Sequence, residues 1–121
     1  MTRVGARIVV LTLILALLPV AVSLAADLST PKASIASQFE LLKAGDVEGL
    51  KACFTDRLKD KITAESVKKG QGETAKYTLE DLVDKVEQGK GTAKIKMKNG
   101  RTLTTLIEKD GKWYADTIWF K

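Results

Sequence analysis

The spacing of apolar residues changes once along the chain, and the change predicts helices first and strands afterwards. Between positions 31 and 62, apolar side chains recur every three or four residues, as in an amphipathic helix. From position 91 onward they recur every second residue, as in a half-buried strand. This order predicts an α+β domain in which two to three N-terminal helices pack on a curved antiparallel sheet of three to four strands.

The first helix is predicted to begin at Thr30-Pro31 and to end at Gly45. Threonine is a good cap, and proline fits the first helical position because the N–H it lacks would have no partner there. Ile35, Phe39 and Leu42 lie one turn apart and form the stripe expected to face the core. Gly45 readily adopts the left-handed conformation that ends a helix.

A second helix is expected directly afterwards, with Asp46 as its cap and apolar residues at helical spacing as far as Ile62. Thr55-Asp56 is a point at which this helix could divide into two. Residues 66–76 include two glycines and almost no apolar residue, so we expect an exposed loop there. A short strand over residues 62–67 is an open alternative.

A third helix is predicted to start after Thr78 and to end at Gly89. Thr78 and Asp81 have the spacing of a capping box. One face of this helix would be apolar, made of Leu79, Leu82, Val83 and Val86.

The first strand of the alternating region turns at Asn99-Gly100. Ala93 and Ile95 alternate with lysines, which predicts one buried and one exposed face. A two-residue loop would place Ile95 opposite Thr104, whereas a three-residue loop with a left-handed Gly100 would place it opposite Leu103. We favour the three-residue loop, which makes Leu103, Thr105 and Ile107 the inner face of the next strand.

The last strand is predicted from Trp113 to Phe120, after a turn at residues 109–111, and it is apolar on both faces. One face should meet the helices, and the other needs a cover. Trp113, Ala115 and Trp119 lie on one face, and Tyr114, Asp116, Ile118 and Phe120 lie on the other.

The first 26 residues have the pattern of a cleavable export signal. Basic residues precede an apolar run from Ile8 to Val22, and small residues that suit cleavage after Ala25 or Ala26 follow it. A retained membrane anchor is the alternative, but Pro19 and the lack of a basic cluster after the run favour cleavage. We therefore expect a single domain over residues 27–121 that is periplasmic or secreted, with no stable membrane span.

Composition excludes several kinds of chemistry. Removing Arg3 and Arg7 with the leader reduces the 20 basic residues to 18, against 15 acids, and a net charge of +3 is too weak to favour nucleic acid. The chain has no histidine and one cysteine, Cys53, so His-dependent triads and zinc clusters are excluded. We expect neither a metal nor a cofactor.

Two local motifs resemble a known family, the nuclear transport factor 2-like superfamily. Residues 39–50, with the junction Gly45-Asp46 between two helices, resemble the start of that fold. Residues 109–114, with the turn Asp110-Gly111 before Trp113, resemble its final hairpin. The resemblance implies a cone-shaped, cystatin-like fold and a short exported member of unknown function. Members of this superfamily serve as enzymes, ligand carriers and docking proteins, so the resemblance does not select a function.

The two-sided last strand suggests a binding function. We expect a non-enzymatic domain that binds a small apolar ligand or a protein partner through its sheet face or a shallow pocket, and a homodimer through the sheet would cover the same face. The candidate ligand-binding residues are Tyr114, Asp116, Ile118 and Phe120.

An enzyme of the isomerase or dehydratase kind is one alternative. It would use Asp116 as a base, with Tyr114 and Tyr77 to stabilise an oxyanion. The simpler interpretation is that Asp116 pairs with a lysine at the surface.

An envelope-associated structural protein is the other alternative. Lys94, Lys96 and Lys98 form a basic row that would suit an anionic surface. The same row could equally protect the strand from pairing with other chains.

Overall fold

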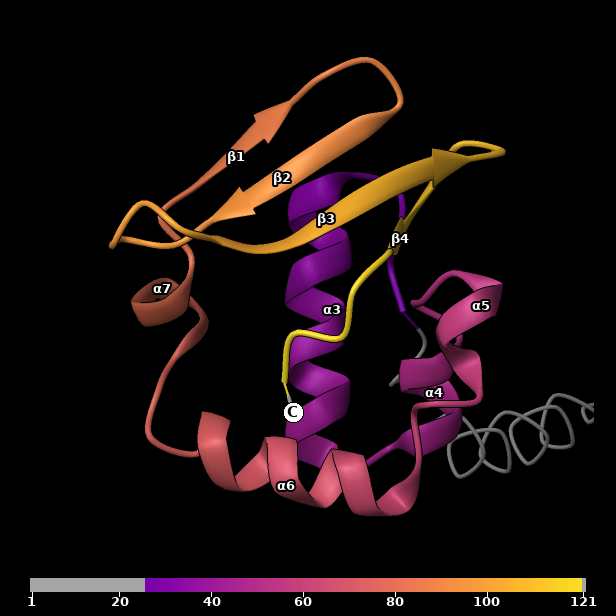
Figure 1. The fold of residues 1–121 in the computed structure, drawn as a ribbon, viewed down its shortest axis with the longest axis vertical. Coiled ribbons are helices and arrows are strands. Elements are labelled where there is room, and N and C mark those ends of the chain that lie inside the picture. The colour runs from indigo at the N-terminus through magenta and orange to yellow at the C-terminus, as the bar shows by residue number, and fades with distance from the viewer. Residues whose placement is uncertain (1–25, 121) are drawn as a thin grey trace, which may run out of the picture.

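The computed structural model describes residues 26–120, in which a four-stranded antiparallel sheet covers one end of a long helix and shorter helices surround the other end (Figure 1). The predicted export signal lies outside the described residues, apart from Ala26. The α+β class is confirmed. Along the chain the elements are α3 (Pro31–Ala44), α4 (Val47–Lys51), α5 (Asp56–Lys59), α6 (Ala64–Thr74), α7 (Leu79–Leu82), β1 (Lys85–Gln88), β2 (Thr92–Lys96), β3 (Thr102–Lys109) and β4 (Lys112–Ala115).

Helix α3 has the predicted bounds, because both of its ends are fixed by local hydrogen bonds. The Thr30 hydroxyl accepts a hydrogen bond from the backbone N–H of Ala33 at 3.0 Å. At the other end Gly45 adopts φ 75°, and its N–H turns back to the carbonyls of the last turn. The predicted stripe is buried, with Ile35, Phe39 and Leu42 each at most 3% exposed.

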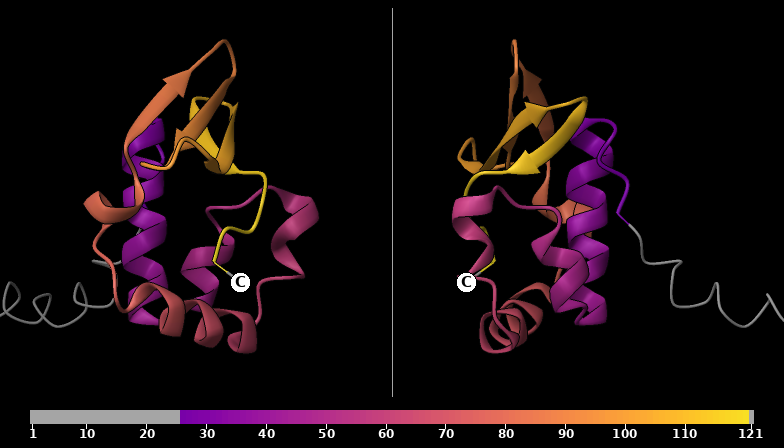
Figure 2. Two further views of the ribbon diagram at one scale, coloured as in Figure 1. Left: turned by 60° about the vertical axis from the view of Figure 1, so that its left-hand side comes forward. Right: turned by 90° about the vertical axis from the view of Figure 1, so that its right-hand side faces the viewer.

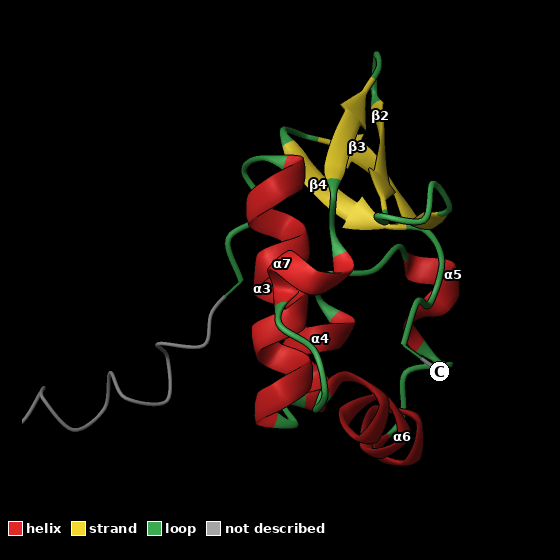
Figure 3. Cartoon of the chain, turned by 90° about the vertical axis from the view of Figure 1, so that its left-hand side faces the viewer, coloured by secondary structure: helices red, strands yellow, loops and turns green. Residues whose placement is uncertain are grey.

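The predicted second helix is divided at Thr55, as its sequence allowed, into α4 and α5. The following region corrects the prediction, because the expected loop over residues 66–76 is helix α6 and residues 62–67 form no strand. Thr63 and Ser66 form a capping box at its start. Helix α6 crosses the C-terminal end of α3, where it buries Val67 and Gly70 (Figures 2 and 3).

The predicted third helix is much shorter than expected. Its capping box forms between Thr78 and Asp81, but the helix ends at Leu82, and residues 85–88 become strand β1. The apolar positions of residues 79–86 have helical spacing, so the strand is decided by contacts outside this segment. Pairing of Val86 with Ile95 on β2 favours the strand, since β-branched residues pack well between neighbouring strands.

The turn between β2 and β3 is the three-residue loop that we favoured. The Met97 N–H donates to the Arg101 carbonyl at 2.7 Å, and Gly100 has φ 89°. Lys96 accordingly lies opposite Thr102.

One residue further along, a β-bulge changes the register, and the predicted inner face of β3 is wrong. Ile95 lies opposite Thr104 instead of Leu103, because β3 contains one extra residue at this point. An insertion of one residue moves every following side chain to the other face. Thr104 and Leu106 are therefore buried, while Leu103, Thr105 and Ile107 are half-buried.

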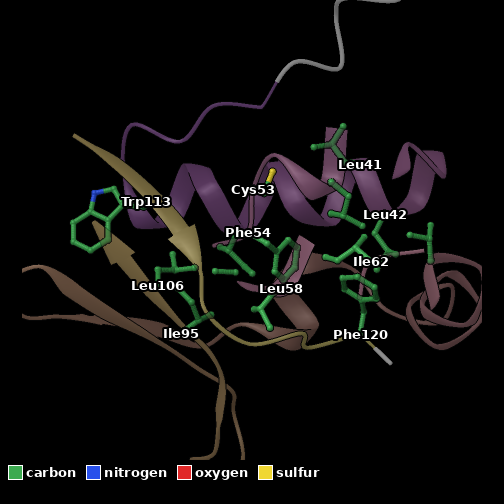
Figure 4. Packing of buried hydrophobic residues seen from close by; sticks show 14 of the residues in the cluster. Leu41, Leu42, Cys53, Phe54, Leu58, Ile62, Ile95, Leu106, Trp113 and Phe120 are labelled. Atoms are coloured by element: carbon green, nitrogen blue, oxygen red, sulfur yellow. The ribbon is translucent and has the colours of Figure 1, made fainter. Parts of the chain in front are cut away.

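Strand β4 is also shorter than predicted, because it ends at Ala115. Trp113 and Ala115 point inward as expected. The chain then leaves the sheet, so that Phe120 enters the core near Leu42 and Ile62 instead of lying on the outer face with Tyr114 (Figure 4). Trp119 stacks on Phe39 and donates its indole N–H to Gln38 at 2.8 Å.

Within residues 26–120, no helix is both long enough and apolar enough to cross a bilayer.

Candidate functional site

The four candidate residues of the last strand do not share one face. Tyr114 is half-buried on the outer face of the sheet, the face turned away from α3. Asp116 forms an ion pair just beyond the strand. Ile118 packs at the edge of the core, and Phe120 is 2% exposed within it. Of the four, only Tyr114 lies on the outer face of the last strand, where the alternating pattern predicted all of them to lie.

Tyr114 lines a hollow of about 480 Å³ between α5 and the β3–β4 turn, which we call the α5–hairpin groove. The hairpin contributes Ile107, Lys109, Asp110 and Tyr114, and the other side is formed by residues 54–57 and 59. The two sides are held together because β4 pairs with this segment. The Thr55 N–H donates to the Ala115 carbonyl at 3.0 Å, and the Ala115 N–H donates to the Cys53 carbonyl at 2.8 Å.

The apolar part of the α5–hairpin groove is a cross-strand pair. Ile107 and Tyr114 lie directly opposite each other on β3 and β4, and both are half-buried. Such neighbours form one continuous apolar surface, because opposite side chains in an antiparallel pair are about 5 Å apart. Phe54 also borders the hollow, but it is fully buried and adds no exposed apolar surface.

The basic side chains around the groove differ in whether they already form ion pairs. Arg57 is bound to Asp116, and Lys59 lies 3.9 Å from Asp56 and donates to the Lys51 carbonyl at 3.3 Å. Lys109 makes no ion pair with any residue between 26 and 120. Lys109 is therefore the cation best placed to meet a ligand.

Asp116 joins the end of β4 to α5. Its carboxylate accepts from Arg57 Nε at 3.1 Å and from the Thr55 hydroxyl at 2.9 Å, and the Arg57 guanidinium also donates to its backbone carbonyl at 2.7 Å. The hydrogen bond from Arg57 is the main reason that the pKa of Asp116 is lowered from its usual 3.8. A carboxylate that acts as a general base near neutral pH needs the opposite shift. The expected ion pair of Asp116 forms, but its partner is Arg57 and not a lysine.

We expect Asp116→Asn to lower the free energy of unfolding by about 1 kcal/mol at neutral pH, since the pair is partly exposed. Because the pKa is lowered on folding, the carboxylate stabilises the fold fully above pH 3.8 and loses this effect as the pH falls through the lower folded-state value. Urea unfolding at several pH values should show the difference between wild type and variant shrinking below that point. The exposed Asp60 provides the control, and a pH-independent difference would contradict the ion-pair explanation.

Tyr77 does not join Asp116 and Tyr114. It is 44% exposed and lines a separate, smaller depression with Trp119 and Leu82. The trio proposed for an enzyme is therefore not assembled at the α5–hairpin groove.

The basic row is interrupted by the fold. Lys94 lies opposite Glu87, and Lys96 lies opposite Lys85 on β1, while Lys98 belongs to the turn beyond β2. Within residues 26–120, no three acidic or thiol side chains gather closely enough to hold a metal ion. Cys53 is fully buried, and burial raises the pKa of its thiol to about 12.

A second hollow, of about 510 Å³, lies between the N-terminal end of α3 and β1, and we call it the β1 groove. Its apolar lining comes from Pro31 and Ile35 on α3 and from Leu79, Val83 and Val86. The sequence did not reveal it, because the last three residues were expected on one continuous helix.

Comparisons with known proteins give a fold and no family. No family model matches the chain, and no curated protein matches it. Its fold is similar to the solution structure of a SEC-C motif containing protein from Rhodopseudomonas palustris. The two chains are 11% identical, the match covers 74% of this chain and 77% of the other, and the TM-score is 0.50. At this identity the likeness concerns the fold alone.

The expected membership of the nuclear transport factor 2-like superfamily is wrong. The structural neighbour is a SEC-C motif protein with a different fold, and no family model supports the assignment. Both motifs behind the resemblance are local. Gly45 ends a helix before the Asp46 cap, and Asp110-Gly111 makes a tight hairpin turn. Unrelated folds use the same residues to end helices and to form such turns, so neither motif identifies a family.

Proposed function

We propose that this protein is a non-catalytic, exported binding domain that holds a small apolar ligand in the α5–hairpin groove. The observation that carries the proposal is the half-buried cross-strand pair of Ile107 and Tyr114, which lines a hollow of about 480 Å³. That volume falls within the usual range for small-ligand pockets, which are mostly apolar with a few polar groups at the rim. Export to the periplasm or the medium rests on the pattern of the first 26 residues.

The lining favours a flat apolar ligand with one anionic or acceptor group. A ring can lie against the face of Tyr114 and the side chain of Ile107, since aromatic and branched side chains offer broad contact surfaces. Lys109 lies at the rim of the same groove and has no acidic partner between residues 26 and 120. A carboxylate or sulfonate on the ligand would supply that partner.

Non-catalytic binding fits the groove better than the isomerase-like alternative. Asp116, the carboxylate that an isomerase-like enzyme would use as its base, is engaged by Arg57 and Thr55, and its pKa is lowered. It holds the two walls of the groove together, which is a structural role.

The proposal can be tested with anilinonaphthalene sulfonate, an aromatic anion of suitable size. In an NMR titration, we expect the signals of Ile107 and Tyr114 to shift most. Tyr114→Ala should raise the dissociation constant by on the order of tenfold, because it removes the main apolar contact. Lys109→Gln should weaken binding less.

Tyr77→Ala is the matched control, because this tyrosine is exposed in a different depression and its loss should leave binding unchanged. Heat unfolding of each variant checks that the fold survives. Shifts concentrated at Leu79 and Val83 would place the ligand in the β1 groove, and they would refute the assignment to the α5–hairpin groove.

A further inference from the structure

The two edges of the sheet differ in how they are covered. On the outer side of β4, the Trp113 N–H donates to the Leu28 carbonyl at 2.9 Å, and Ala115 pairs with the segment around Phe54. On the outer side of β1, no described segment pairs with the strand (Figure 1). Among residues 26–120, β1 is therefore the sheet edge that is left without a partner, and an uncovered edge can pair with another strand.

The backbone groups available at this edge can be identified from the pairing with β2. The Gly89 N–H donates inward to the Thr92 carbonyl at 2.7 Å. Backbone N–H and C=O groups alternate in direction along a strand. Those of Lys85 and Glu87 therefore also face β2, whereas those of Val86 and Gln88 face outward.

Charge then selects one register for pairing with a second copy. Two identical antiparallel strands must be centred on a residue, and a centre at Lys85 or Glu87 would place like charges opposite each other. A centre at Gln88 would place Glu87 opposite Gly89 and would form no pair of opposite charges. A centre at Val86 places each Lys85 opposite the other copy's Glu87. The two Val86 residues would face each other and exchange two backbone hydrogen bonds, because their groups point outward.

We propose that two copies of this chain pair through β1, antiparallel and centred on Val86, and join two four-stranded sheets into one. The pairing gives Lys85 a new acidic neighbour, which offsets the like charge of Lys96 directly opposite it on β2. Glu87 already lies 3.6 Å from Lys85 on the same face, and both side chains are about half exposed or more, so they can exchange partners.

The apolar lining of the β1 groove supports the same interface. Val86 points to the inner side of the sheet, where Leu79 and Val83 leave an apolar surface partly exposed. A second copy against β1 would cover part of this surface, and such burial favours association. The interface includes neither Tyr114 nor Lys109, so it is independent of ligand binding in the α5–hairpin groove.

Charge-exchange variants test the register directly by sedimentation equilibrium. Glu87→Lys and Lys85→Glu should each raise the dissociation constant of the dimer by about tenfold or more, since each places like charges opposite one another twice. Mixing the two variants should restore association as a heterodimer. The double variant K85E/E87K should dimerise like the wild type. These exposed residues contribute little to the fold of one copy.

Val86→Pro provides a second, backbone-level test. Proline removes an outward N–H that one copy does not use, and edge strands tolerate it, so the variant should be folded and monomeric. A wild-type protein that remains monomeric at concentrations of about a millimolar would overturn the proposal. The edge of β1 would then be available to pair with a strand of another protein. A dimer that both single charge variants leave unchanged would overturn it as well.

Discussion

Phe120→Ala is expected to lower the free energy of unfolding by roughly 3–5 kcal/mol, as truncation of a fully buried phenylalanine usually does. Phe120 is 2% exposed although it stands next to the last residue of the chain. Its ring contacts Phe54 and Trp119 edge to face, with centroids 5.9 and 5.4 Å apart. Small domains are stable by about 5–15 kcal/mol, so this loss should leave a substantial unfolded fraction.

Urea unfolding followed by circular dichroism measures this loss. Tyr77→Ala is the control, because Tyr77 is the exposed aromatic residue near the same end of the molecule and its truncation should cost less than about 0.5 kcal/mol. A Phe120→Ala variant as stable as this control would mean that the end of the chain does not enter the core.

The position of Phe120 explains why the last strand was only partly predictable. Alternation from Trp113 to Phe120 correctly placed Trp113 inward and Tyr114 outward. The strand ends at Ala115, and the next residue, Asp116, is held by Arg57 from α5, which is distant in the sequence. Apolar alternation shows that a segment can be a strand, but not where distant contacts end it.

Local signals predicted the elements that are fixed locally. The Thr30 cap, the Gly45 stop and the Gly100 turn all form as expected, because each depends on hydrogen bonds within a few residues. The β1 segment was mistaken for helix because the apolar residues at 79, 82, 83 and 86 have helical spacing. Pairing with β2, which this spacing does not reveal, decides its structure instead.

The candidate groove could be anticipated only through Tyr114. Ile107 was assigned to the wrong face because the bulge opposite Ile95 adds a residue that leaves no mark in the apolar pattern. The predicted turn at residues 109–111 brings Lys109 near Tyr114, but Arg57 comes from α5, and nothing in its local sequence places it beside them. Spatial proximity of this kind is produced by the tertiary fold.

Helix α6 was missed because of Gly70 and Gly72, and these two glycines should respond in opposite directions to alanine. At Gly72, a new Cβ would meet no atom within 4 Å. Gly72→Ala should therefore raise the free energy of unfolding by about 1 kcal/mol, the usual difference between the two residues in a helix. Glycine at this position serves no packing purpose in one copy of the chain.

At Gly70, a new Cβ would lie 2.7 Å from Phe120 Cδ1 and 2.9 Å from the Phe120 carbonyl oxygen. Leu42 closes the third side at 3.0 Å. Gly70→Ala should lower the free energy of unfolding by about 1–3 kcal/mol, because overpacking forces neighbouring groups to move. The same urea experiment compares the two alanine variants within one helix.

A second substitution separates overpacking from a general intolerance of alanine in α6. In a Phe120→Leu background, the smaller side chain removes the nearest ring atom, so Gly70→Ala should cost less than it does in the wild type. The effect of Gly72→Ala should be the same in both backgrounds, since a Cβ at position 72 contacts neither Gly70 nor Phe120. If the Gly70→Ala and Gly72→Ala variants were equally stable, α6 could not lie against Phe120. Close packing would then not explain why residue 70 is a glycine.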